Sequence, residues 1–116
     1  MVIENLIAII SGICETVMEQ GSLAEDAPYP AERFFTFWNA SSDDHKHYDN
    51  ETYGYTWTVD VNFYSTDPAD VYSALDAARL ALKAAGWKIN GKGHAVYSDE
   101  PNYTGRGMTA VFLEIE

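Results

Sequence analysis

The segment "SSDDHKHYDNE", residues 41–51, holds the side chains best suited to chemistry. His45 and His47 lie two positions apart, and Asp43 and Asp49 flank them. In an extended chain all four would project from one face, and imidazole with carboxylate can bind zinc or iron. Metal ligands are usually held by rigid elements and supporting hydrogen bonds, whereas these donors lie among serine, lysine and asparagine. We therefore expect a solvated hairpin loop, with a metal site or a segment that orders against a partner subunit as alternatives.

Other residues with catalytic potential are not arranged for catalysis. Cys14 is the single cysteine, and its apolar helical surroundings predict a buried thiol and exclude a disulfide framework. Asp99 and Glu100 are adjacent in sequence, so they point differently and do not define an acid/base pair. The segment "NGKGH", residues 90–94, lacks the spacing of a phosphate-binding loop and is expected to form a tight turn. We predict no enzymatic activity and no cofactor.

The segment "RFFTFWN", residues 33–39, is rich in aromatic side chains. Alternation along a strand favours core packing for such residues over stacking on bases or sugars. Aromatic residues on both faces of one strand also indicate that the second face is covered, and another subunit could cover it. We therefore expect Phe35, Phe37 and Trp38 to take part in an intersubunit contact.

The segment "SDEPNYTGRGMT", residues 98–109, is expected to form a compact polar loop before the last strand. In one interpretation it is a structural turn in which Arg106 pairs with a nearby carboxylate. In the other it is a contact surface, because the planar guanidinium suits carboxylate recognition at interfaces. The candidate contact residues in this segment are Asp99, Glu100, Pro101, Thr104, Gly105 and Arg106.

Two helices are predicted from apolar residues at three- and four-residue spacing. The first covers residues 1–20 and ends at Gly21. The second covers residues 66–86, where Asp67 can cap the first amides and Gly86 ends the helix. Its buried stripe is expected to consist of Val71, Leu75, Ala78 and Leu82.

Strands are predicted at residues 33–39 and 53–65, joined as a hairpin with residues 40–52 as its long loop. In the second strand Val59, Val61 and Phe63 alternate with Asp60 and Asn62, so one face is expected to be buried and the other wet. Residues 87–116 are expected to form a glycine-interrupted strand, a turn and a last strand. The order is therefore α-β-β-α-β-β within a single α+β domain, residues 1–116. The simplest arrangement is a four-stranded, mainly antiparallel sheet with two helices on one face.

The chain carries 18 acidic and 7 basic residues, for a net charge of −11. This charge argues against direct nucleic-acid binding through phosphates, which requires lysine and arginine. It fits a protein that works beside DNA without adhering to it, or a DNA mimic. The apolar start lacks a basic region and is interrupted by acids, so it does not predict a secretion signal. With no run that could span a membrane, we expect a cytoplasmic protein without membrane partners.

The combination of "FFTFWN", "FYSTDP", "GKG" and "SDEP..TGRG" resembles a family of small proteins from phages and prophages of Gram-positive bacteria. The resemblance covers residues 29–116. We identify these relatives with the tail-terminator or tail-completion proteins that are encoded among neck and tail genes.

The resemblance implies a structural subunit that forms a ring, commonly hexameric, at the head-proximal end of a long non-contractile tail. Such a ring ends tail-tube growth and joins the head, so its partners would be itself, the tail-tube protein and head-completion proteins. It would occur in the bacterial cytoplasm during assembly and in the virion tail if the phage is active. An acidic inhibitor or DNA mimic acting on a host nucleic-acid enzyme is the alternative function. A metal-binding module built on His45 and His47 is a third hypothesis.

Overall fold

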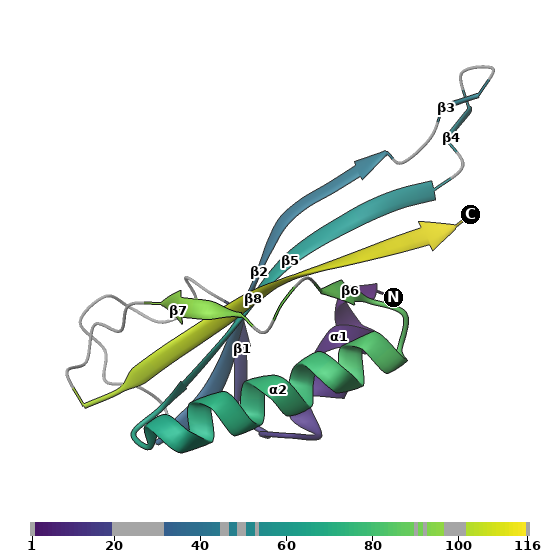
Figure 1. Cartoon of the computed structure of the whole chain (residues 1–116). Helices are drawn as coiled ribbons and strands as arrows, with labels where there is room; N and C mark the ends of the chain where they lie inside the picture. Colours follow the sequence, from purple (N-terminus) through teal and green to yellow (C-terminus); the bar gives the residue numbers. More distant parts are fainter. Residues whose placement is uncertain are drawn as a thin grey trace.

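The computed structural model describes residues 2–19, 32–44, 47–48, 51–52, 54–89, 91, 93–96 and 102–115. Within these residues the chain is α+β, with both helices on the same side of a six-stranded sheet (Figure 1). The elements are α1 Val2–Ser11, β1 Val17–Glu19, β2 Arg33–Asp44, β3 His47–Tyr48, β4 Glu51–Thr52, β5 Gly54–Ser65, α2 Pro68–Ala84, β6 Lys88–Ile89, β7 His94–Val96 and β8 Thr104–Ile115.

The three long strands β2, β5 and β8 form the centre of the sheet, whose order is β1-β2-β5-β8-β6. β2 pairs antiparallel with β5, and β5 pairs antiparallel with β8. The short strand β1 adds to β2 in parallel, while β6 and β7 both pair with β8. β3 and β4 form a separate two-stranded sheet. The predicted hairpin between residues 33–39 and 53–65 is confirmed.

The predicted four-stranded sheet with order α-β-β-α-β-β is wrong, and the first helix is one reason. Instead of continuing to residue 20, α1 ends at Ser11, where Gly12 weakens the helix. The β-branched residues Thr16 and Val17 then favour an extended chain. The Thr16 carbonyl accepts a hydrogen bond from the Phe35 amide at 2.9 Å, which aligns β1 beside β2. The apolar spacing is helical at the start of the chain but does not show where the helix stops.

The strand boundaries differ from the prediction at two further places. β2 continues to Asp44, and β3 and β4 follow, so residues 40–52 are not simply a loop. The region after α2 holds two short strands, β6 and β7, instead of one interrupted strand. Gly91 and Gly93 separate them, with φ angles of 73° and 94° that other residues rarely adopt. These positive angles redirect the chain so that both strands reach the same neighbour, β8.

The second helix begins and is buried as predicted. The Asp67 carboxylate accepts a hydrogen bond from the Ala69 amide at 3.0 Å, and Pro68 occupies the first helical position. The expected stripe is buried, and Ala74 extends it along the same face. Gly86, with φ of 103°, follows the end of the helix.

Replacing Asp67 with alanine is expected to lower the free energy of unfolding by about 1 kcal/mol, because an amide of the first turn loses its acceptor. Urea unfolding followed by circular dichroism measures this loss. Asp67→Asn is the matched control, since an asparagine side chain can still cap the helix. An equal loss in both variants would show that the cap is not the cause.

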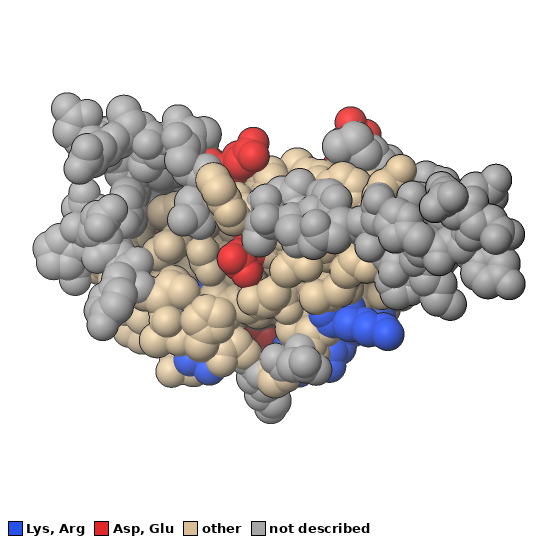
Figure 2. Space-filling model, turned by 90° about the horizontal axis from the view of Figure 1, so that it is seen from above, with Lys and Arg blue, Asp and Glu red and all other residues tan. Residues whose placement is uncertain are grey.

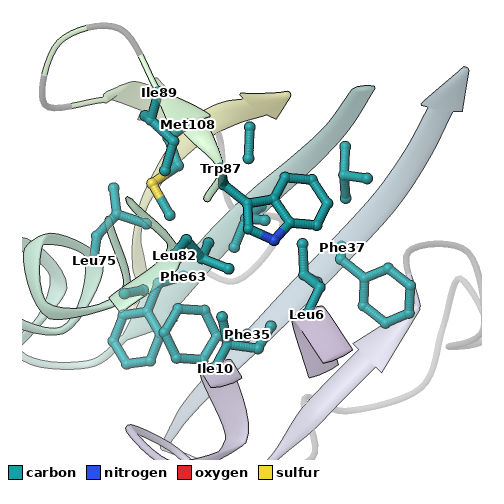
Figure 3. Packing of buried hydrophobic residues seen from close by; sticks show 14 of the residues in the cluster. Leu6, Ile10, Phe35, Phe37, Phe63, Leu75, Leu82, Trp87, Ile89 and Met108 are labelled. Carbon is teal, nitrogen blue, oxygen red and sulfur yellow. The ribbon is translucent and has the colours of Figure 1, made fainter. Parts of the chain in front are cut away.

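The core lies between the helices and one face of the sheet. Figure 3 shows side chains of α1, β2 and β5, together with Trp87, meeting in a common interior. Along β5 the predicted core face is confirmed, because Val59, Val61 and Phe63 are fully buried, but Asn62 on the face predicted to be wet is buried as well. The Phe35 and Phe63 ring centroids lie 4.6 Å apart at a tilt of 57°. Among the described residues, no helix is both long and apolar enough to cross a membrane.

Candidate functional site: the helix-free face of the sheet

The side chains that alternate with the core residues project from the other side of the sheet, away from both helices (Figure 1). We call this surface the helix-free face. The register places Trp38 of β2, Asp60 of β5 and Thr109 of β8 in one row across it. The next row along the strands brings together Thr36, Asn62, Gly107 and His94. The helix-free face is defined by Phe34, Thr36, Trp38, Asp60, Asn62, Tyr64, Val96, His94, Gly105, Gly107 and Thr109.

A hollow of about 400 Å³ lies on this face, which Figure 2 views from above. Two of the residues that line it are joined by a hydrogen bond of 2.9 Å, which the Thr109 hydroxyl donates to the Asp60 carboxylate. Trp38 stands at the hollow with 48% of its surface exposed, unusually high for a side chain of this size. The lining residues are Trp38, Asp60, Asn62, His94, Val96 and Thr109. An exposed indole beside oriented polar groups is typical of protein contact surfaces.

Two glycines of β8 leave space on this face for the side chains of the neighbouring strand β5. A Cβ atom on Gly107 would lie 2.0 Å from the Asn62 side-chain oxygen. On Gly105 it would lie 2.7 Å from the Tyr64 ring. The absence of side chains at these positions lets Asn62 and Tyr64 lie across the strand, and Tyr64 stacks on Phe34 at 5.2 Å. The glycines of the predicted "TGRG" motif therefore shape the surface through their neighbours.

Thr36 carries a buried hydroxyl that has no hydrogen-bond partner among the described residues. A buried polar atom without a partner destabilises the folded state. Replacing Thr36 with valine, which has the same shape, is expected to raise the free energy of unfolding by about 1 kcal/mol. Thr36→Ser, which keeps the hydroxyl and removes a methyl group, is the control and is expected to be destabilising. Urea unfolding measures both, and a loss of about 1 kcal/mol in the valine variant would contradict the assignment.

The three aromatic residues predicted to make an intersubunit contact lie in two different environments. Phe35 and Phe37 lie in the hydrophobic core, so they pack within this chain. Trp38 lies on the opposite side of the same strand and is exposed. Alternation along β2 explains the division, and of the three it leaves Trp38 as the side chain available to a partner.

The segment predicted to be a polar loop, residues 98–109, joins the last strand earlier than expected. Thr104, Gly105 and Arg106 belong to β8 and are not in a loop. The Arg106 guanidinium lies 4.8 Å from the centre of the Tyr72 ring and donates to the Gly93 carbonyl at 3.1 Å. These contacts tie β8 to α2 and to the turn before β7, a positioning role. Asp99, Glu100 and Pro101 lie outside the described residues.

The histidine-rich segment is divided by the structure. Asp43 lies in β2, whereas His47 lies in β3 of the separate small sheet. His45 and Asp49 lie outside the described residues. In the part of the chain that the structure describes, no group of three or more His, Cys, Asp or Glu side chains is placed to hold a metal ion. Cys14 is buried, as predicted, and its thiol donates to the Arg33 carbonyl at 3.5 Å.

The polar residues that line the hollow were not predicted from the sequence as site residues. The alternation of β5 placed Asp60 and Asn62 on the wet face, which was the available signal. His94 and Thr109 join them only through the pairing of β7 and β5 with β8, and that register is not visible in the sequence. In comparisons with known proteins, no protein-family model and no curated protein matched the chain.

Proposed function

We propose that this protein is a structural subunit of the neck and tail region of a phage or prophage. In this proposal it is a tail terminator or tail-completion protein, forms a ring that ends tail-tube growth, and joins the tail to the head. It binds copies of itself, the tail-tube protein and head-completion proteins, and it has no enzymatic activity. The motif resemblance in the sequence suggests this role. The observation that carries it in the structure is the helix-free face with its exposed Trp38.

The chemistry of the helix-free face supports contact with a protein. A half-exposed indole gives a large apolar anchor, and Asp60, held by Thr109, supplies a polar group in a fixed position. Interface hot spots are often tryptophan residues surrounded by polar groups that exclude water. The net charge of −11 is compatible with a channel that DNA crosses without adhering to the wall.

A DNA mimic has less support. Mimicry requires carboxylates spaced like phosphates along one face. Figure 2 shows the acidic side chains of the described residues as separate spots on the helix-free face, with basic side chains at one border. On the described part of this face, the acidic side chains do not reproduce the continuous charge of a nucleic-acid backbone.

The test is the length of tail tubes assembled from the tail-tube protein of the same phage and measured by negative-stain electron microscopy. Wild-type protein is expected to shorten the tubes and to leave a ring at one end. Trp38→Ser is expected to require at least about tenfold more protein for the same shortening, because a central anchor is lost.

Leu80→Ser is the matched control, since Leu80 is a large apolar side chain 55% exposed on α2, on the other side of the sheet. It is expected to shorten tubes as the wild type does. Tubes of unchanged length with wild-type protein would overturn the proposed function. Equal activity of wild type and Trp38→Ser would exclude the helix-free face as the contact.

A further inference from the structure

The two borders of the sheet carry opposite charge. β1 forms one end of the strand order, and Glu15 and Glu19 are exposed there. β6 forms the other end, and Lys83 and Lys88 are exposed there, at the end of α2 and on β6 itself. We call the first pair the acidic border and the second pair the basic border. In Figure 2 basic atoms lie along the lower border of the molecule, whereas acidic atoms lie at the upper border and also in the middle of the face and near the lower border.

Charged groups beside these borders are already paired within the chain. Arg33, the cation near the acidic border, holds the Asp70 carboxylate with two hydrogen bonds of 2.9 and 3.0 Å. Arg79, one turn before Lys83 on α2, pairs with Asp76 at 2.8 Å. Within each of these pairs the two opposite charges neutralise each other. Of the described charges named at the two borders, Glu15 and Glu19 on one side and Lys83 and Lys88 on the other take part in no such pair.

Among the described residues, the outer strands β1 and β6 pair with only part of the length of β2 and β8. β1 covers β2 only between Phe35 and Phe37, and β6 covers β8 only at Ala110 and Val111. β7 pairs with β8 near its start, at Gly105–Gly107. Toward the C-terminal ends of β2 and β8, β5 is the only described strand that pairs with either of them. Both uncovered stretches lie at the same end of the sheet. Unpaired edge amides and carbonyls are a ready template for pairing with another chain.

We infer that a second copy of this chain binds head-to-tail, with the acidic border of one copy against the basic border of the next. Two acidic borders repel each other, as do two basic borders, so like-to-like pairing is disfavoured. A contact between two different surfaces of one chain generates a ring when the rotation closes. The inference deepens the proposed function and rests on it for the expectation that the ring closes. It assigns the self-contact of that ring to the two sheet borders.

The test is a charge exchange between the borders, read by sedimentation velocity on the full chain. Glu15→Lys with Glu19→Lys makes both borders basic, and Lys83→Glu with Lys88→Glu makes both acidic. Each double variant alone is expected to associate at least about tenfold more weakly than the wild type. An equal mixture of the two is expected to recover association, because every contact again joins opposite charges.

The fourfold variant, which exchanges the charges of both borders, is expected to associate as the wild type does. This variant and the mixture keep the inference testable even if one double variant folds poorly, and circular dichroism of each variant checks folding. Rising salt is expected to weaken association of the wild type, because exposed charges are screened.

Recovery in the mixture and in the fourfold variant would support the contact. Equal association of all variants would overturn it while leaving the proposed function intact. A wild-type protein that stays monomeric but still shortens tail tubes would overturn the contact and the proposed ring, and would leave only the role in ending tube growth. A monomer that does not shorten them would overturn both.

Discussion

Replacing Phe63 with alanine is expected to lower the free energy of unfolding by about 3–5 kcal/mol. Phe63 is fully buried near the end of β5, and its ring packs on Phe35 at a centroid distance of 4.6 Å. The Arg33 guanidinium lies 5.5 Å from the same ring. Truncation removes these contacts and leaves a cavity between the sheet and α2. Because proteins are stable by only about 5–15 kcal/mol, this loss is a large part of the total.

Urea unfolding followed by circular dichroism measures the change. Leu80→Ala is the matched control, because Leu80 is 55% exposed on α2 and its truncation is expected to change stability by about 0.5 kcal/mol or less. A Phe63→Ala loss as small as that of Leu80→Ala would contradict the packing of the core.

The second large effect is expected for Gly93→Ala. Gly93 has φ of 94°, where an L-residue is strained. A Cβ atom there would lie 2.7 Å from the Gly107 carbonyl and 2.9 Å from a methyl group of Leu75. The backbone strain and the overpacking each cost about 1–3 kcal/mol. The turn between β6 and β7 would shift, and the Gly93 carbonyl would lose its position beside Arg106.

Gly91→Ala separates the two contributions. Gly91 also has a positive φ, 73°, but a Cβ atom there would meet nothing within 4 Å. It is therefore expected to carry the backbone cost alone, about 1 kcal/mol. Thermal unfolding of both variants measures the difference. A Gly93→Ala variant no less stable than Gly91→Ala would show that β7 does not approach β8 as closely as described.

The elements with strong local signals could be predicted from the sequence. The Asp67-Pro68 start and the apolar stripe of α2 are both local features, and both are confirmed. Alternation in β5 separated the fully buried Val59 and Val61 from Asp60, which lies on the opposite face of the sheet. Short-range spacing carries this information because side-chain direction repeats with the period of the element.

The sheet topology could not be predicted in the same way. β1 and β6 are too short for a periodic signal, with three and two residues. Their place depends on hydrogen bonds to strands that are distant in sequence, such as the Phe35 amide to the Thr16 carbonyl. The candidate site has the same origin, since Trp38 and His94 line one hollow only because β2, β5, β8 and β7 lie in register.

The most direct test of the proposed role is the mass of the wild-type assembly by native mass spectrometry at high protein concentration. A closed ring predicts one species whose mass is a whole-number multiple of the 12.9 kDa chain mass, and the family resemblance implies a sixfold multiple. A head-to-tail contact that closes leaves no free border, so larger species are not expected to accumulate. A protein that stays monomeric at every concentration would contradict the proposed ring.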